Sequence, residues 1–350
     1  MTELPEQRLQ RTKEQVGAAV KRLAVRDSLP SKPPEGSLWG SLDKAIIQAY
    51  VARAGREAAR EGRAIIMAGP PGAGKSHGVA AVRQVLGPEE SRRFGVVEDG
   101  YVTVDADDVK QLLLGNPVPG LEIDPDLLAR ARQHWDAVIA ECAPEPLADG
   151  RPLLRGELAT LVHPLSTATA DSARKRLVAM RTNIKIEGTL QWMEPSGEGQ
   201  GPRLLKELAV RRYTQVSIVA VDASKELCLA GAHHRWAEPR STGDVTARYA
   251  PPEAVESMFT PGNPISRCID NARTTHDLAR QEEVFKDVNL FIAHRGERPA
   301  VEHIDQAGKA RVLPARPQQP RTPTVTGELG QGRAGKRASL SRTRRPGLER

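Results

Sequence analysis

Residues 69–76 form a glycine-rich run that ends in a lysine and a hydroxyl side chain and reads Gly-Pro-Pro-Gly-Ala-Gly-Lys-Ser. Glycines allow a tight turn whose backbone N–H groups point at phosphate oxygens. Lys75 can then reach the β- and γ-phosphates, and Ser76 offers its hydroxyl to Mg²⁺. The apolar run 64–68 before the turn predicts a buried strand, and 76–85 predicts a helix. This strand–loop–helix predicts a binding site for ATP and Mg²⁺, formed by Gly69, Pro70, Pro71, Gly72, Ala73, Gly74, Lys75, Ser76 and His77.

Two carboxylates two residues apart follow a second predicted strand, 101–104. Asp105 could hold Mg²⁺ through its water shell while Asp107 accepts a proton from an acceptor hydroxyl. The alternative is a solvated turn or a helix N-cap, where Asp is also favoured. In either case, the pair lies at a strand end.

The predicted elements alternate along the chain, which indicates an α/β fold. This is the pattern of a P-loop NTPase, kinase-like, with a mainly parallel sheet and helices on both faces. In such sheets ligands bind at the carboxyl ends of strands, so the polar residues that close each strand become candidates for chemistry. The further strands are 183–186, 215–221 and 288–293, the last closing the fold, and the helices between strands are 127–141, 168–180, 204–210 and 271–285. Residues 111–165 and 192–202 are expected to include insertions or long loops.

Charge and composition divide the chain into three parts. Residues 1–40 predict a helical extension (6–26) and a Pro-rich linker (30–36), and residues 41–300 predict the kinase domain. Residues 301–350 carry 11 basic and 4 acidic side chains and account for the whole net charge of +7. We expect this tail to be disordered. Because no aromatic residues separate its charges, the sequence favours a solvated extension over a nucleic-acid-binding tail.

The remaining features predict a cytoplasmic protein. No apolar stretch approaches the ~20 residues of a membrane span, and the first residues lack the pattern of a signal peptide. Three widely spaced cysteines, Cys142, Cys228 and Cys268, fit reduced thiols. We therefore expect no membrane contact.

Several motifs, in order along the chain, resemble the zeta-toxin family of toxin–antitoxin systems. They are Val-Asp-Ala-Asp-Asp-Val-Lys at 104–110, Val-His-Pro-Leu-Ser at 162–166 and Ile-Glu-Gly-Thr at 186–189. Later segments at 233–236, 245–248 and 285–290 are also similar to the family, so the resemblance spans roughly residues 62–297. It implies a P-loop kinase that phosphorylates the nucleotide sugar UDP-N-acetylglucosamine on the 3′-hydroxyl of its amino sugar. Toxicity and a small antitoxin partner follow from the resemblance alone.

The resemblance also implies roles for individual residues. The Walker lysine of the family matches Lys75, and its catalytic general base matches Asp107. Two phosphate-clamping arginines match Arg235 and Arg248, whose planar permanent charge suits the three equatorial oxygens of a transferring phosphoryl group. The substrate-binding residues of the family match Asp171, Glu187 and Thr189.

The sequence departs from the family on the acceptor side. Gln191 replaces a basic residue, an Asp stands at 171 where Glu is usual, and a Gly-rich segment (195–201) lengthens the following loop. Two alternatives therefore stay open. The acceptor could be another nucleotide, such as NAD, or an antibiotic. The chain could also be a nucleic-acid-linked ATPase that uses Asp222 as a Walker-B carboxylate together with the basic tail.

Overall fold

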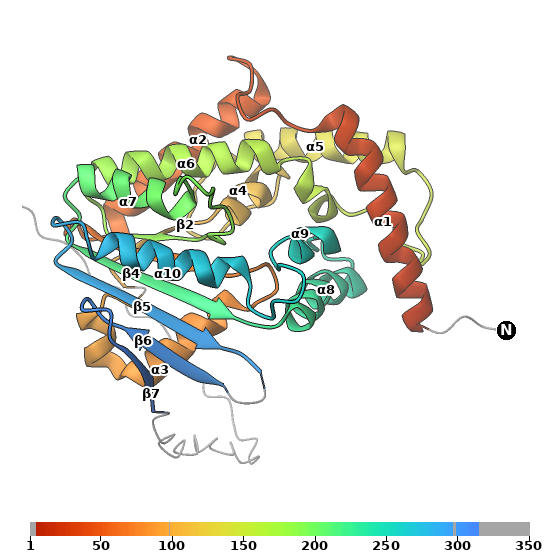
Figure 1. Ribbon diagram of the computed structural model, residues 1–350. Helices are drawn as coiled ribbons and strands as arrows, with labels where there is room; N and C mark the ends of the chain where they lie inside the picture. Colours follow the sequence, from red (N-terminus) through yellow and green to blue (C-terminus); the bar gives the residue numbers. More distant parts are fainter. Residues whose placement is uncertain (1–4, 98, 297–298, 315–350) are drawn as a thin grey trace, which may run out of the picture. The chain divides into compact units, whose positions relative to one another are not determined.

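The computed structural model describes residues 5–314 apart from 98 and 297–298. Within these residues seven strands form one sheet in the order β2–β3–β1–β4–β5–β6–β7 (Figure 1). The first five in this order are parallel, and β6 and β7 are added antiparallel. The α/β fold and the mainly parallel sheet are thus confirmed. The strands are β1 Arg63–Ala68, β2 Val102–Val104, β3 Ile184–Ile186, β4 Gln215–Asp222, β5 Asp287–His294, β6 Ala300–Ile304 and β7 Ala310–Leu313.

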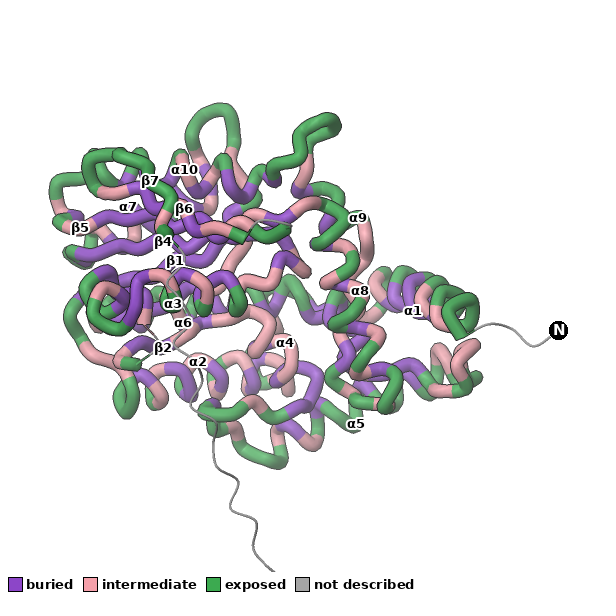
Figure 2. Tube along the Cα trace, turned by 90° about the horizontal axis from the view of Figure 1, so that it is seen from below, coloured by how far each residue is buried: buried purple, intermediate pink, exposed green. Residues whose placement is uncertain are grey.

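Helices cover both faces of the sheet, as the sequence predicts. Alternate side chains of β1 serve the two faces: Ile66 joins the core on the side of α2, α6, α7 and α10, whereas Ile65 and Met67 join the core beneath α3. Strands β1, β4 and β5 are buried along nearly their whole length, as Figure 2 shows. Burial on both faces explains why these strands read as continuous apolar runs rather than alternating ones.

There are more helices than the sequence predicts; α5, α6 and α7 start earlier than predicted, whereas α10 ends at Ala279 rather than at 285. Those not predicted are α4, α8 and the short α9, together with the 3₁₀ helix η1; helix α3 extends through a break at Gly87. The bounds are α1 Pro5–Asp27, α2 Leu38–Glu57, α3 Lys75–Arg93, α4 Ala106–Leu113, α5 Pro125–Cys142, η1 Arg155–Thr160, α6 His163–Ala179, α7 Gln200–Val210, α8 Lys225–Thr242, α9 Pro252–Glu256 and α10 Arg267–Ala279.

The prediction that the tail begins at residue 301 and that β5 closes the fold is wrong. Strand β6 pairs with β5, from Leu290 opposite Ile304 to His294 opposite Ala300, and β7 pairs with β6. Val301 and Ile304 of β6 are buried, but the segment Ala-Val-Glu-His-Ile does not alternate regularly, and it stands at the start of a long polar stretch. The rest of the predicted tail, from residue 315, lies outside the described residues.

Helix α1 packs into the same core as the rest of the chain. Val16, Val20 and Leu23 are at most 3% exposed and belong to the buried cluster that also holds α2 and α5. A Cβ atom at Gly17 would lie 2.7 Å from the hydroxyl of Tyr249, so the helix backbone closely approaches this side chain. Among the described helices, none is both long enough and apolar enough to cross a bilayer.

Candidate active site

Strand β1 leads into the phosphate-binding loop, and α3 begins at Lys75, as predicted. Gly72 and Gly74 have φ angles of 80° and 77°, a left-handed conformation that other residues adopt only with strain. The Lys75 ammonium donates to the carbonyl of Gly69 at 3.4 Å. Ser76 and His77 are exposed in the first turn of α3. The loop therefore has the geometry that phosphate binding requires.

Helix α8 packs directly on this loop through glycines on both sides. A Cβ atom at Gly72 would lie 1.9 Å from the carbonyl oxygen of Cys228, and one at Gly231 would lie 2.4 Å from the carbonyl oxygen of Gly72. No larger side chain fits between the two backbones. Arg235 lies on the same helix, about three turns from its start.

Arg295 follows β5 and contacts the phosphate loop, and the sequence analysis did not identify it. Its guanidinium donates to the carbonyl of Ala73 at 2.8 Å, and its backbone N–H donates to the carbonyl of Asp222 at 2.7 Å. A single arginine in an arginine-rich chain forms no recognisable motif. The feature that could have indicated Arg295 is its position directly after the carboxyl end of β5. Arg295 ties the phosphate loop to the ends of two strands.

Asp107 is held between two cations. Its two carboxylate oxygens lie 2.9 Å from Lys110 Nζ and 2.6 Å from Arg248 Nη1. Burial acts to raise the pKa of Asp107, but Lys110 and Arg248, with a further contribution from Lys75, hold it below its usual range. The charges of Asp107, Arg248 and the phosphate-loop lysine therefore influence one another. Lys110 is a second missed residue, although it lies within the quoted motif.

Asp105 is the N-cap of α4: its Oδ1 accepts a hydrogen bond from the backbone N–H of Asp107 at 2.8 Å. The capping alternative considered from the sequence is therefore correct for this residue. Burial raises the pKa of Asp105 to about 7, with further contributions from Asp107, Asp108 and Glu187. Such a carboxylate lacks compensating positive charge.

Arg235 is exposed to solvent on α8. Loss of hydration and the neighbouring Arg248 lower the pKa of its guanidinium, and Asp107 and Asp105 act in the opposite direction. The two predicted arginines and the two predicted aspartates are thus electrostatic neighbours. They come from α8, the segment after it, and the start of α4.

The Glu-Gly-Thr segment lies beside the phosphate loop, because the carbonyl of Thr189 accepts from the N–H of Gly69 at 3.1 Å. Glu187 pairs with Lys185 at 2.8 Å, and both side chains are largely buried. Leu190, with φ of 53°, is one of the non-glycine residues in the left-handed region. Asn271 of α10 donates to its carbonyl at 2.6 Å and so stabilises this strained turn. Asn271 is a third missed residue.

Asp171 is engaged elsewhere. Its carboxylate pairs with Arg174 at 2.5 Å, and Arg174 also contacts Glu207 at 3.1 Å. None of the contacts described for Asp171 links it to Lys75 or Asp107. The structure therefore does not join this predicted residue to the rest of the site.

Asp222, the carboxylate of the ATPase alternative, is paired at the end of β4. Its Oδ2 lies 3.0 Å from His294 Nδ1, and His294 Nε2 lies 3.4 Å from Glu302 on β6. The hydrogen bond to Asp222 raises the pKa of His294 against the effect of burial. The charged partner of Asp222 is thus His294 of the neighbouring strand β5.

Mg²⁺ fits the donors at this edge of the sheet. The raised pKa of Asp105 marks a carboxylate surrounded by negative charge, and the Ser76 hydroxyl is accessible at the start of α3. Mg²⁺ commonly keeps several waters and takes one or two carboxylates together with substrate phosphates. Among residues 5–314, as far as described, no group of three or more His, Cys, Asp or Glu side chains is arranged to hold a metal.

No protein-family model matches the chain, and no curated protein matches it. Among solved structures, the chain is similar to one from the PezAT chromosomal toxin–antitoxin system of Streptococcus pneumoniae, with 15% identity over 77% of this chain and 83% of that chain and a TM-score of 0.46. It is also similar to the AvrRxo1-ORF1:-ORF2 structure with ATP, with 11% identity over 89% and 75% of the two chains and a TM-score of 0.44.

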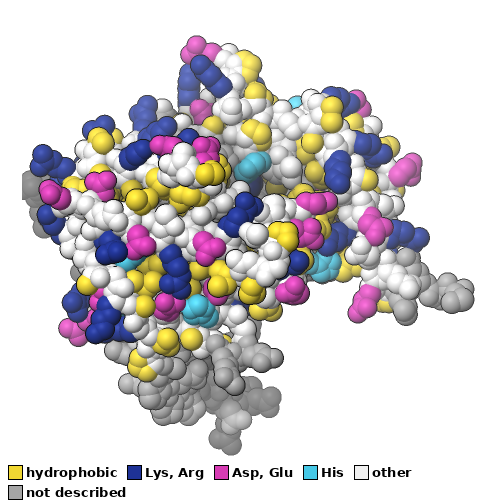
Figure 3. Space-filling view, viewed as in Figure 1, with side chains coloured by type: hydrophobic (Ala, Val, Ile, Leu, Met, Phe, Trp, Pro, Cys, Tyr) yellow, Lys and Arg dark blue, Asp and Glu magenta, His cyan; other side chains and the backbone are white. Residues whose placement is uncertain are grey.

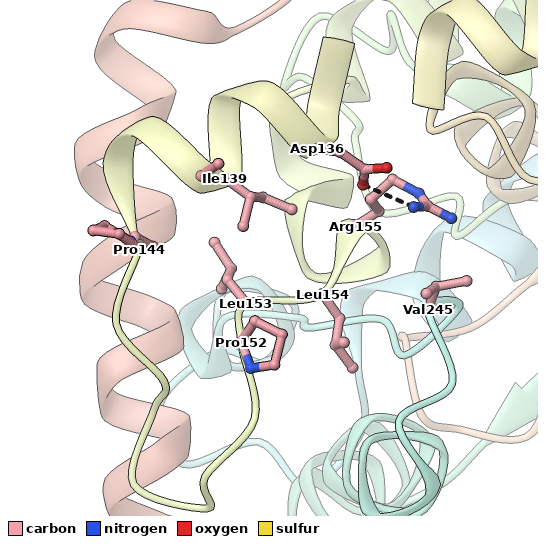
Figure 4. Close-up of a pocket in the computed structure, with 10 residues that line it drawn as sticks. Asp136, Ile139, Pro144, Pro152, Leu153, Leu154, Arg155 and Val245 are labelled. Atoms are coloured by element: carbon pink, nitrogen blue, oxygen red, sulfur yellow. Dashed lines mark hydrogen bonds and ion pairs between the residues drawn. The ribbon is translucent and has the colours of Figure 1, made fainter. Parts of the chain in front are cut away.

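A pocket of about 420 Å³ lies outside this site (Figure 4). It is lined by Ile139 of α5, by Ala143 directly after that helix, by Leu153 and Leu154, and by Val245. In Figure 4 the Asp136–Arg155 ion pair closes one side of it. The pocket contains none of the predicted site residues, but its wall is continuous with the segment that carries Arg248.

Proposed function

We propose that this chain is an ATP-dependent kinase that transfers the γ-phosphoryl group to a hydroxyl of a small molecule. The position of Asp107 carries the proposal, because its carboxylate pairs with Arg248 and lies within the field of Lys75. The proposed base thus pairs with an arginine and is influenced by the charge of the phosphate-loop lysine. Phosphoryl transfer requires mainly positioning and positive charge, and this arrangement supports both.

In the reaction, the acceptor oxygen forms a bond to the γ-phosphorus while the bond to the β–γ bridging oxygen breaks, and ADP leaves. Asp107 accepts the proton of the acceptor hydroxyl, and its lowered pKa keeps it ionised at neutral pH. Arg248 and Arg235 stabilise the charge of the transferring group. Mg²⁺, held by Ser76 and Asp105, would supply further positive charge to the phosphates.

We propose UDP-N-acetylglucosamine as the acceptor, bound through Glu187 and Thr189, with Asp171 as the third substrate contact. The hydrogen bond between Thr189 and Gly69 supports an acceptor site next to the phosphate loop. A small antitoxin protein as partner and a cytoplasmic location belong to the same proposal. They rest on the resemblance of the motifs at 104–110 and 186–189.

Phosphorylation of UDP-N-acetylglucosamine, followed by mass spectrometry with purified protein and ATP, tests the proposal. Lys75→Ala and Asp107→Ala should both abolish the product, and Asp107→Ala should keep ATP binding. Asp126→Ala is the matched control, because Asp126 occupies the equivalent position of α5, two residues after the capping Asp124, on the exposed surface. Undiminished turnover of Asp107→Ala would falsify the assignment of the base.

A scan of a metabolite mixture for compounds that gain one phosphate separates the acceptors. If NAD or an antibiotic gains the phosphate, the proposed kinase activity stands and the proposed acceptor is wrong. Hydrolysis of ATP without transfer, stimulated by DNA or RNA, would instead support the ATPase. On the face drawn in Figure 3, Lys and Arg side chains are interspersed with acidic ones rather than gathered in one basic patch.

A further inference from the structure

A buried charged cluster lies beside the turn that follows α8 and carries Arg248 (residues 243–248). The guanidinium of Arg240 on α8 is fully buried and donates to both oxygens of Asp149, at 2.8 and 2.9 Å, and to Glu157 Oε1 at 2.7 Å. The Glu157 side chain is also fully buried, and it accepts from the indole N–H of Trp236 at 2.7 Å and from the backbone N–H of Leu154 at 2.8 Å. Every oxygen of Glu157 thus has a partner.

Burying this cluster carries a large desolvation cost for the fold. Removing two charges from water costs several kcal/mol per ion, and well-packed apolar residues often stabilise a protein equally well. Burial itself acts to raise the pKa of Glu157, against the effect of Arg240. What directional ion pairs add, and apolar contacts do not, is a fixed geometry.

The cluster joins the segment 149–157 to α8 and to the turn after it. Directly beside Glu157, the N–H of Gly156 donates to the carbonyl of Val245 at 2.8 Å. A Cβ atom at Gly156 would lie 2.5 Å from the carbonyl oxygen of Ala247, the residue before Arg248. The two backbones are therefore in contact where the arginine leaves the turn.

Apolar packing also holds this segment and the turn. Leu153 and Leu154 are buried in the core, at 2% and 6% exposure, and with Val245 they line the pocket of about 420 Å³ (Figure 4). Ala247, in the turn, is fully buried as well. The ion pairs of Arg240 and the backbone contact at Gly156 add directional restraints to this packing.

We infer that Asp149, Glu157 and Arg240, acting through the backbone contact at Gly156, form a positioning unit that places the Arg248 guanidinium against Asp107. This inference rests on the proposed function for its kinetic consequence, but not for the geometry. None of these residues touches the reacting groups: they act through Arg248. A displacement of about 1 Å at such a charge can cost on the order of 100-fold in rate.

Gly156→Ala tests the inference, because it pushes on the turn without changing any charge. Gly55→Ala is the matched control, since nothing lies within 4 Å of the added methyl group. In the full chain we expect Gly156→Ala to lower kcat by about 10- to 100-fold, with the ATP Kd changed less than about twofold. In an Arg248→Ala background the same substitution should have no further effect on kcat. An equal loss in both backgrounds, or a wild-type kcat for a folded Gly156→Ala, would overturn the inference.

A second measurement needs no kinase activity. Thermal unfolding of the single and double variants of Arg248→Ala and Asp107→Asn measures the coupling between the two side chains, and Glu157→Gln provides a gentler change than Gly156→Ala. The coupling should be present in the wild type and reduced in both Gly156→Ala and Glu157→Gln. Coupling unchanged in a folded Glu157→Gln variant contradicts the positioning unit. Absence of transfer by the wild type to any acceptor contradicts the kinase instead.

Discussion

Arg248 lies 2.6 Å from Asp107, although the two residues are 141 positions apart in the chain. Asp107 lies in the first turn of α4, after β2, whereas Arg248 follows α8. The pair joins the base of the proposed reaction to the cation proposed to stabilise the transferring phosphoryl group. The first prediction follows from the effect of this cation on Asp107.

Asp107→Asn should lower kcat by about 100- to 10,000-fold and leave ATP affinity within a fewfold of the wild type, because it removes a proton acceptor and not a phosphate contact. Lys110 and Arg248 hold the pKa of Asp107 below its usual range, so the base stays ionised as the pH falls. The rate should therefore show no loss from this group above about pH 4. An acidic limb near pH 6 that disappears in Asp107→Asn would contradict the lowered pKa.

Asp105 should make stability depend on pH in the opposite direction. Its pKa is raised to about 7 by burial and by neighbouring carboxylates, so its ionisation destabilises the fold. Stability relative to Asp105→Asn should fall as the pH rises from about 4 to 7, by at most a few kcal/mol, and stay level above that. Thermal unfolding across pH measures this difference, and asparagine keeps the N-cap.

Asp124→Asn provides the control for Asp105, because Asp124 caps α5 with the same contact on the exposed surface. Mg²⁺ with ATP should reduce the pH dependence, since a bound cation favours the ionised carboxylate of Asp105. A pH profile that Mg²⁺ with ATP leaves unchanged would argue against Asp105 as a metal-binding residue.

Gly72→Ala should damage the phosphate loop severely. The added methyl group would lie 1.9 Å from the carbonyl oxygen of Cys228, at a φ of 80°. We expect a loss of about 3 kcal/mol or more in the free energy of unfolding, together with lost ATP binding. Gly36→Ala is the control, because it has a φ of 74° with nothing within 4 Å and should cost about 1–2 kcal/mol. Equal effects of the two substitutions would mean that the contact between α8 and the loop is unimportant.

Glu187→Gln should raise the KM for the acceptor by about 10- to 100-fold and leave the KM for ATP unchanged. Because the substitution leaves buried Lys185 without its 2.8 Å partner, the double variant with Lys185→Met should recover stability but not the acceptor KM. Glu198→Gln, an exposed residue paired with Lys206 at 3.1 Å, is the control. A parallel rise in both KM values would place Glu187 outside the acceptor site.

The sheet and the phosphate loop could be predicted because their signals are local. Strand β1 is a continuous apolar run, and Gly72 and Gly74 occur where the turn requires left-handed backbone. Helix α8 escaped prediction because its buried residues, such as Cys228 and Trp236, face two different cores rather than one stripe. Strand β6 was missed because its five residues stand before a long polar segment.

Within the site, residues with a motif were predictable and residues with only a spatial role were not. Asp107 and Lys75 belong to recognisable patterns. Arg295, Asn271 and Glu157 act through contacts with segments 79 or more residues away along the chain. A single sequence carries no trace of such pairings, and only the folded chain shows them.

The antiparallel pair β6–β7 protects the edge of β5, the strand that leads to Arg295 and its contact with the phosphate loop. Without it, β5 would expose a row of unpaired backbone groups, an edge at which another chain could add a strand. Because β6 covers that edge, the backbone that precedes Arg295 is held by neighbours on both sides. Cutting the chain at residue 299 would open this edge, and self-association of the shortened protein would then compete with nucleotide binding.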